Sequence, residues 1–468
     1  MPRPKRRLLL GAPSAMLLVV AGGAVAQARE TAAPVSPRPA DAPAAVVRDV
    51  QTGAPLAADW AADDWREVFD DPDLMALLTE ALDRNLTIES ARQRLQQAQA
   101  LQRRTNNAER PGLDLLGLPL QDVPTGDGYY QLGLATRWEV DFFGANAARD
   151  QEAEARTAAQ AAQLRAARLM IATSLIQAYY ERHEAQVRLA LSRQSHELSL
   201  RALDLVQVRV DTGLADARER RAASIEENRH RIEQARLQYQ IERASRTLDA
   251  LLSRSDPVSQ DQAAGHFASV RFPAELKAND LRRRPDVMTA EAEVLEAAAR
   301  VRIARAALYP SLSLSGSISY TRSLSSAPSP GGLMPVIGPT IDIPLWDWGR
   351  RRAMVNSEDH ALSSALALYH QAVIEAAGEV QTAFSALEQQ QAIVTARRET
   401  VETLRRSLDA WTTRHDLGLA SDLDMIQPQT DLLEARSALV DARLDSITAL
   451  LHIFKAAGGP LLAEETTP

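Results

Sequence analysis

Two short segments, 205 residues apart, constrain this chain more than any other feature. They are residues 209–215 and 414–420, and Arg, Asp, Gly, Leu and Ala recur at equivalent positions in both. Each segment separates two long helical patterns, and Gly213 and Gly418 suit the left-handed conformation that closes a helix. A chain that forms the same long helical hairpin twice is predicted to be an internal duplication.

The segments next to the hairpins repeat as well. Pro111 and Pro310 are 199 residues apart and precede stretches with strand character, while Gly144 and Gly349 are 205 residues apart and precede long helices. The spacing changes only across the strand stretches, where insertions are expected. We therefore predict one elongated, mainly helical body made of two similar halves. Charged residues at 24% and aromatic residues at 4% are typical of such long helices.

The long helices carry a seven-residue repeat of apolar side chains. Residues 145–211 contain neither Pro nor Gly, which predicts one helix of about 100 Å at 1.5 Å per residue. After the first turn, Ile225, Ile232 and Tyr239 follow one another at intervals of seven. Such a repeat makes a packing seam between long helices. In the second long helix the repeat occupies Leu366, Val373, Val380, Leu387, Val394, Val401 and Leu408.

Four segments alternate apolar with polar or small residues and are predicted to be strands: 113–120, 130–140, 311–320 and 334–346. Pro119 predicts that the first is an edge strand or ends early. Strands of about ten residues can cross a bilayer when tilted. Spanning strands must close into a barrel, and four are too few, so several chains would have to share one. The alternative is a small soluble sheet that caps a helical bundle.

Aromatic residues gather where the strands meet the helices. They fit a belt at a membrane interface, and under the alternative of a soluble sheet they would be core residues. They are Trp138, Phe142 and Phe143 in the first half and Tyr309, Trp346 and Trp348 in the second.

Residues 1–28 are predicted to be a secretory signal peptide. A basic region (Arg3, Lys5, Arg6 and Arg7) precedes an apolar run from 8 to 20, which is too short to span a membrane comfortably. Removal of these four cations takes the formal net charge from −8 to −12, and an acidic protein is a poor candidate for nucleic-acid binding. The chain has no cysteine, so neither disulfides nor lipidation of a cysteine is expected.

The sequence argues against an enzyme and predicts no cofactor or metal. It contains no glycine-rich phosphate loop, nucleophile elbow or metalloprotease motif. The cluster Glu358-Asp359-His360 lies on a predicted helix, where a solvated face is the ordinary explanation and a metal site the alternative.

Several longer motifs make the chain resemble the TolC/OprM-like outer-membrane factors, the exit ducts of tripartite efflux pumps. The resemblance covers residues 65–459, and the missing cysteine marks a non-lipidated member. Its most specific segments are 283–287 (Arg-Arg-Pro-Asp-Val) with Ala290-Glu291, 304–306, 309–314, 138–144 and 344–350.

The resemblance implies a homotrimer in the Gram-negative outer membrane that extends into the periplasm. Each chain would give four strands to a twelve-strand barrel and its long helices to an α-helical tunnel. The duct would conduct drugs or other solutes passively, without a cofactor, and would open like an iris at its periplasmic tip. Its partners would be outer-membrane lipid, a periplasmic adaptor and an inner-membrane efflux transporter. The alternative function is a periplasmic or secreted coiled-coil scaffold without a pore.

The resemblance also implies roles for the two turns. The adaptor would contact Gly213, Leu214, Ala215, Gly418, Leu419 and Ala420. Asp422, Asp424 and Gln427 would lie at the periplasmic aperture, where three copies of an inward carboxylate form an anionic ring. The family has an acid where this chain has Gln427, and Asp422 is the residue that could compensate. The alternative is that Asp422 and Asp424 are ordinary acids near a helix N-terminus.

The expected organisation follows from these assignments. The segments are 1–28 signal peptide, 29–62 extended leader, 63–110 equatorial and tunnel helices of the first repeat, 111–144 first strand hairpin, 145–254 first long helical hairpin, 255–283 linker, 284–309 tunnel helix of the second repeat, 310–349 second strand hairpin, 350–457 second long helical hairpin and 458–468 C-terminal tail.

Overall fold

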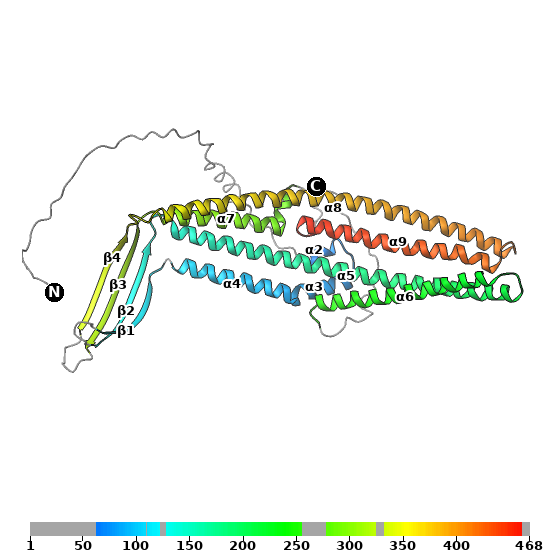
Figure 1. Ribbon diagram of the computed structural model, residues 1–468, viewed down its shortest axis with the longest axis horizontal. Coiled ribbons are helices and arrows are strands. Elements are labelled where there is room, and N and C mark those ends of the chain that lie inside the picture. The colour runs from blue at the N-terminus through cyan, green and yellow to red at the C-terminus, as the bar shows by residue number, and fades with distance from the viewer. Residues whose placement is uncertain (1–61, 109, 122–127, 255–277, 324–331, 461–468) are drawn as a thin grey trace, which may run out of the picture. The chain divides into compact units, whose positions relative to one another are not determined.

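The computed structural model describes residues 62–108, 110–121, 128–254, 278–323 and 332–460, so the expected signal peptide, most of the leader and most of the linker lie outside the described residues (Figure 1). The elements are α2 (Ala62–Arg66), α3 (Pro72–Arg84), α4 (Leu86–Ala108), β1 (Gly112–Gln121), β2 (Gly128–Val140), α5 (Ala145–Asp211), α6 (Ala217–Leu251), the 3-10 helix η2 (Ala278–Arg283), α7 (Pro285–Ala306), β3 (Ser311–Ser323), β4 (Gly332–Asp342), α8 (Arg350–Asp416) and α9 (Asp422–Ala457). The prediction of a mainly helical chain with four strands is confirmed.

The two halves have the same order of elements. A helix, a strand pair and a long helical hairpin occur as α4-β1-β2-α5-α6 and again as α7-β3-β4-α8-α9. Both α5 and α8 have 67 residues, about 100 Å at the usual rise. Each begins directly after a glycine in the left-handed conformation, Gly144 with φ 76° and Gly349 with φ 80°. The duplication in the sequence is therefore also a duplication in structure.

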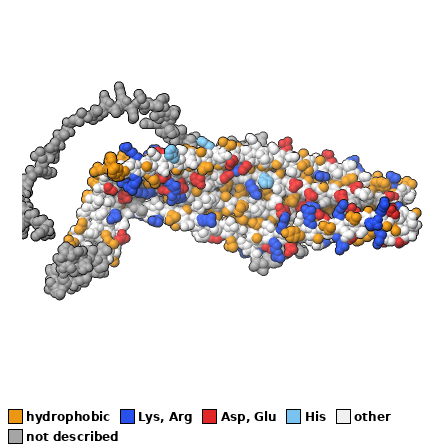
Figure 2. Space-filling view, in the orientation of Figure 1, with side chains coloured by type: hydrophobic (Ala, Val, Ile, Leu, Met, Phe, Trp, Pro, Cys, Tyr) orange, Lys and Arg blue, Asp and Glu red, His pale blue; other side chains and the backbone are white. Residues whose placement is uncertain are grey.

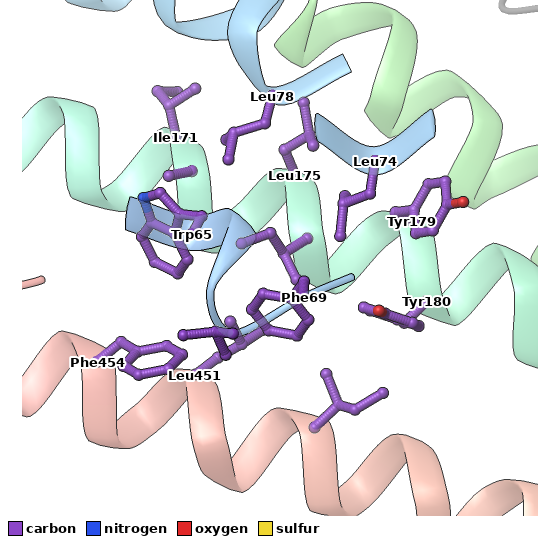
Figure 3. Packing of buried hydrophobic residues seen from close by; sticks show 14 of the residues in the cluster. Trp65, Phe69, Leu74, Leu78, Ile171, Leu175, Tyr179, Tyr180, Leu451 and Phe454 are labelled. Atoms are coloured by element: carbon purple, nitrogen blue, oxygen red, sulfur yellow. The ribbon is translucent and has the colours of Figure 1, made fainter. Parts of the chain in front are cut away.

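The helices lie side by side, and α5 is the central one. It packs against its hairpin partner α6, against α9 of the other hairpin, and against α4 and α7 (Figure 1). The largest buried cluster lies where α2 and α3 cover α5 and α9 (Figure 3). Trp65 and Phe454 meet edge to face with ring centroids 5.3 Å apart, and Phe69 packs on Tyr180 at 5.9 Å. The short N-terminal helices thus fasten the two hairpins together.

A buried polar contact fixes α3 within this cluster. The carboxylate of Asp71 caps α3 by accepting hydrogen bonds from the backbone N–H groups of Asp73 and Leu74, at 3.0 and 3.1 Å. Its other oxygen accepts a hydrogen bond of 2.8 Å from the hydroxyl of Tyr179 on α5. Burial, followed by this hydrogen bond, raises the pKa of Tyr179 above its usual value. The same side chain therefore starts a helix and anchors it to its neighbour.

The four strands form one antiparallel sheet in the order β1-β2-β3-β4. Residues that pair across strands share a face, and the register places the apolar residues together. One face carries Leu113, Leu115, Leu132, Leu134, Trp138, Leu312, Leu314, Ile318, Tyr320, Leu333, Ile337 and Ile341, and the other is mainly polar or small, with Asp114, Gln131, Arg137, Glu139 and the serines of β3, apart from Leu116, Met334 and Val336. Most of the apolar face is exposed in the described chain, so the alternative of a soluble cap, which would bury it on the helices, is wrong.

The fourth strand differs from the expectation, and the edge position predicted for the first strand is confirmed. The fourth strand ends at Asp342, four residues before the predicted end at Trp346. Pro344, which has no backbone N–H for a ladder, follows within two residues. The first strand continues through Pro119 to Gln121, and its place at the edge of the sheet tolerates the proline. Segment 343–349 is consequently a connection between β4 and α8, and Trp346 and Trp348 lie in it.

We predict that a single methyl group at Gly133 disturbs the centre of the sheet. A Cβ atom there would lie 2.6 Å from the carbonyl oxygen of Ile318 and 2.7 Å from two atoms of Ser319, the residue paired with it. Gly133→Ala should destabilise the sheet by about 1–3 kcal/mol and reduce the amount of folded protein recovered. Gly338→Ala is the control, because no atom lies within 4 Å of a Cβ at that position. Equal recovery and equal thermal midpoints for the two variants would contradict the prediction.

Candidate functional site

The two turns that organise the sequence have the same backbone structure. Gly213 and Gly418 are left-handed, with φ 75° and 70°. Each donates its N–H to a carbonyl three residues back, and the following leucine donates to a carbonyl five residues back, at 2.7 Å for Leu214 and 2.8 Å for Leu419. This is the Schellman arrangement, which satisfies the last carbonyls of a helix. Both turns lie at the same end of α5 and α9 (Figure 1).

The turns expose apolar side chains. Leu214 is 72% exposed and Leu419 is 67% exposed, whereas the alanines that follow, Ala215 and Ala420, are half-buried. The hydrogen bonds of Ser421, and to a smaller extent the positive charge of Arg209 at the first turn, lower the pKa of Asp424 at the second turn. The residues predicted to contact an adaptor thus lie on two small turns, each with an exposed leucine.

The three predicted aperture residues all have a hydrogen-bond partner. Asp424 forms a capping box with Ser421, accepting hydrogen bonds from its backbone N–H at 2.8 Å and its hydroxyl at 2.7 Å. The hydrogen bonds from the backbone and side chain of Ser421 lower the pKa of Asp424. Asp422 lies 2.8 Å from Nε2 of His415, across the turn. The alternative that both acids serve the helix N-terminus therefore describes Asp424 well.

The third residue leads to a carboxylate that the sequence analysis missed. The side-chain amide of Gln427 donates a hydrogen bond of 2.7 Å to Asp431, one helical turn further along α9. Asp431 lies seven residues after Asp424, so both are on one face of the helix. The four-residue spacing between Gln427 and Asp431 was the signal that could have revealed it.

A polar link joins the two hairpins away from the turns. Arg188 on α5 contacts Glu184 at 3.0 Å and Asp441 on α9 at 2.9 Å through Nη1, and Glu233 on α6 at 3.0 Å through Nη2. Arg188, Glu184 and Asp441 border a cavity of about 380 Å³ between α5, α6 and α9. Burial, followed by a hydrogen bond shared with Asp441, raises the pKa of Glu184 to about 7, against the opposing effect of Arg188. One guanidinium therefore holds three helices.

The junctions between strands and helices hold the predicted aromatic residues. In the first half Phe143 stacks on Tyr309 of the second half, with ring centroids 4.6 Å apart. In the second half Trp346 and Trp348 meet edge to face at 5.6 Å. All of them, together with Trp138 and Phe142, are exposed in the described chain, so they are not the core residues of the alternative interpretation.

Within the described residues, no helix has a stretch long and apolar enough to cross a membrane. The same part of the chain holds no group of three or more histidine and carboxylate side chains arranged for a metal ion. In the cluster Glu358-Asp359-His360, Asp359 forms an ion pair with Arg305 at 2.9 Å.

Comparison with known proteins identifies the family that has this combination of two turns, a four-stranded sheet and long helices. The family model for outer membrane efflux proteins matches residues 77–254 and 278–459, in two blocks that correspond to the two halves. The chain belongs to the outer membrane efflux protein family. It is an outer-membrane exit channel that reaches into the periplasm, and a passive conduit rather than an enzyme. The alternative of a scaffold without a pore is wrong.

Individual relatives agree over nearly the whole length. The chain is 27% identical over 427 residues to the solvent efflux pump outer membrane protein SrpC of Pseudomonas putida, covering 88% of this chain and 89% of that protein. It is 29% identical over 442 residues to the outer membrane protein OprJ of Pseudomonas aeruginosa, covering 89% and 91%. The solved structure of the outer-membrane channel OprN matches with a TM-score of 0.75 and 25% identity, covering 88% and 95%.

We predict that the link at Arg188 is sensitive to pH through Glu184. Because the pKa of this carboxyl is raised from 4.5 to about 7 in the folded protein, its contribution to stability is complete below pH 4.5 and is lost as the pH rises through 7. Glu184→Gln keeps a hydrogen-bond donor and cannot ionise, so it should stabilise the protein above pH 7 by up to about 3 kcal/mol.

The measurement is the thermal midpoint of detergent-purified protein between pH 4.5 and 8.5. The Glu184→Gln curve should be flatter than that of the wild type. Glu181→Gln, a change in the same cavity wall at a residue that hydrogen-bonds to Gln177 instead, is the matched control and should follow the wild type. If the thermal midpoints of wild type and Glu184→Gln change with pH in parallel, ionisation of Glu184 does not affect stability and the prediction is wrong.

Proposed function

We propose that three copies of this chain form one continuous efflux duct, with a twelve-strand barrel in the outer membrane and an α-helical tunnel in the periplasm. The observation that carries the proposal is the sheet, which has one apolar face and two edge strands, β1 and β4, without a partner in the described residues. Lipid cannot satisfy the polar groups of an open strand edge. Pairing β4 of one copy with β1 of the next removes every edge when the ring closes.

The helices support the same assembly. On α6 the apolar seven-residue repeat is exposed to solvent in the single chain: Ile225, Ile232 and Tyr239 are 61%, 71% and 65% exposed. On α8 only Leu387 of the seven repeat positions is buried, and the other six are half-buried. Long apolar seams of this kind are normally covered by another helix. A neighbouring copy that places α8 against α6 covers both seams at once.

The duct would work with an adaptor protein and an inner-membrane transporter. The partner surface at the tip comprises Gly213, Leu214 and Ala215 of the first turn and Gly418, Leu419 and Ala420 of the second. Two similar turns from each of three chains give a nearly sixfold surface, and the exposed leucines suit a partner with an apolar hairpin. The relative SrpC is named as part of a solvent efflux pump, and we propose small, largely apolar solutes as cargo. The aromatic residues at the junctions would lie at the membrane interface.

We predict that a bulky side chain at the second turn uncouples the duct from its partners. Gly418→Trp adds a large group to an exposed tip, where no atom lies within 4 Å of a Cβ. Resistance to solvents or drugs should fall to the level of a deletion strain, while the native mass in detergent remains three times that of the mature chain. Gly418→Asn is the control, because asparagine tolerates the left-handed conformation, and it should retain most of the resistance.

The two readouts test separate parts of the proposal. Full resistance in Gly418→Trp cells with normal amounts of protein would show that the tip is not the partner surface. A native mass other than three chains for the wild type would overturn the trimer and the shared barrel.

We further propose that α9 supplies the aperture with two rings of carboxylates, Asp424 and Asp431, of which Asp431 takes the place of the missing acid at Gln427. Asp431→Asn should lower the cation-to-anion permeability ratio in planar bilayers several-fold, because three charges leave one ring. Gln427→Asp should raise it. Asp431 is the better position to change, since Asp424 also caps the helix. Unchanged selectivity in Asp431→Asn would remove this residue from the aperture.

A further inference from the structure

Three consecutive arginines, Arg350, Arg351 and Arg352, begin α8. The duplication supplies an internal reference for them, because α5 begins after the equivalent glycine and has the same length. At the equivalent positions, 205 residues earlier, the first half has Ala145, Asn146 and Ala147. A long helix of this fold therefore starts without any cation in these places, and the arginines of the second half need another explanation.

The arginines are unfavourable for the helix that carries them. The N-terminal end of a helix has a positive partial charge, which favours anions and disfavours cations. The first turn of α8 contains no acid. The adjacent carboxylate of Asp347 accepts hydrogen bonds from the backbone N–H groups of Gly349 and Arg351, both at 3.1 Å, and lies 3.9 Å from the Arg351 side chain. A negative charge from outside the chain would relieve the repulsion.

The guanidinium groups of Arg350 and Arg352 can still bind an anion. Arg350 and Arg352 are exposed, and neither has a carboxylate partner in the described part of the chain. Guanidinium groups bind phosphate through paired N–H donors. The missing partner is thus an anion that can accept several such bonds.

The apolar residues next to the arginines are unusually bare. Leu345 is 87% exposed, Trp346 77% and Trp348 89%. Trp348 also has a positive φ of 58°, a conformation that is strained for a bulky residue. Burial of the exposed indole against another molecule would offset the energetic cost of this backbone conformation. Figure 2 shows hydrophobic side chains beside basic ones where the strands meet the helices.

We propose that Leu345, Trp346, Trp348 and Arg350–352, together the junction patch, bind the head groups of anionic phospholipids in the periplasmic leaflet of the outer membrane. The proposal rests on the proposed function. With the strands in the outer membrane and the helices in the periplasm, the connection between β4 and α8 lies at the periplasmic surface of the outer membrane. Tryptophan favours this interfacial depth, and each arginine near an anionic surface adds to the attraction. The indoles and Leu345 insert among the lipids while the guanidinium groups hold phosphates.

The phosphate is expected at the exposed arginines and not in the nearby cavity. A cavity of about 240 Å³ lies at the junction, and Arg149 and Arg351 both line it. Its wall also carries three carboxylates, Glu139, Asp141 and Asp342, which outnumber the cations. An anion is repelled there. Arg350 and Arg352, on the outside of the same turn, face no such excess of negative charge.

The test compares lipid retention by native mass spectrometry of the purified full-length protein in detergent. The probes are phosphatidylglycerol and phosphatidylcholine with identical acyl chains. The key variant is Arg350→Ala with Arg351→Asn and Arg352→Ala. It copies the protein's own residues 145–147, a sequence that starts the equivalent helix α5 in the first half. Wild type should retain phosphatidylglycerol over phosphatidylcholine, and the variant should lose roughly tenfold or more of that preference.

Two further variants keep the outcome decisive. Arg350→Ala with Arg352→Ala removes only exposed side chains, so it replaces the triple variant if that variant does not fold. It should lose most of the preference for phosphatidylglycerol. Ala145→Arg with Asn146→Arg and Ala147→Arg adds the patch to the first half and should increase phosphatidylglycerol retention. An equal preference in wild type and in a folded arginine-free variant overturns the inference.

The native trimer mass and recovery from the outer membrane are measured on the same samples. If those fail for the wild type, the proposed function is wrong. If they hold while the lipid preference does not depend on the arginines, only the junction patch is wrong.

Discussion

The structure depends on one constraint, which is that a strand edge inside a membrane has no water to satisfy its backbone groups. Four strands per chain leave two such edges, β1 and β4. We propose that neighbouring copies pair with these edges and also cover α6, whose apolar repeat is exposed. Duplication suits the proposed ring, because each half contributes one strand pair and one helical hairpin, and identical copies can close into a ring.

Equal backbones allow the two halves to differ in chemistry. Both turns close with the same hydrogen bonds, yet Asp422 and Asp424 follow the second, whereas Arg218 and Arg220 follow the first. Both long helices start after a left-handed glycine, yet α8 adds three arginines where α5 has none. Because the backbone is the same in both halves, these side chains are available for the contacts that we propose with lipid, adaptor and solute, although Asp424 also caps α9.

The sequence predicted the helices and turns well because their signals are local. A glycine in a left-handed cap marks a helix end, and α5 ends at Asp211, two residues before Gly213. The end of β4 was missed, since the alternating pattern continues past Pro344 although the ladder does not. Asp431 and the link at Arg188 were also missed. The link joins Arg188 to Asp441, 253 residues away, and depends on how α5 and α9 are rotated, which no pattern within one helix records.

The position of that link bears on how the tip can move. The side-chain hydrogen bonds described at the second turn lie within its own hairpin: Asp424 caps its own helix, and His415 reaches Asp422 across its own turn. Arg188, in contrast, ties α5 to α9, and Asp441 is 19 residues beyond Asp422, or about 29 Å along the helix. The hairpin ends can therefore separate with every cap intact. A separation that extends as far as Asp441 must break the ion pair between Arg188 and Asp441, whereas the contacts of Arg188 with Glu184 and Glu233 stay within the first hairpin.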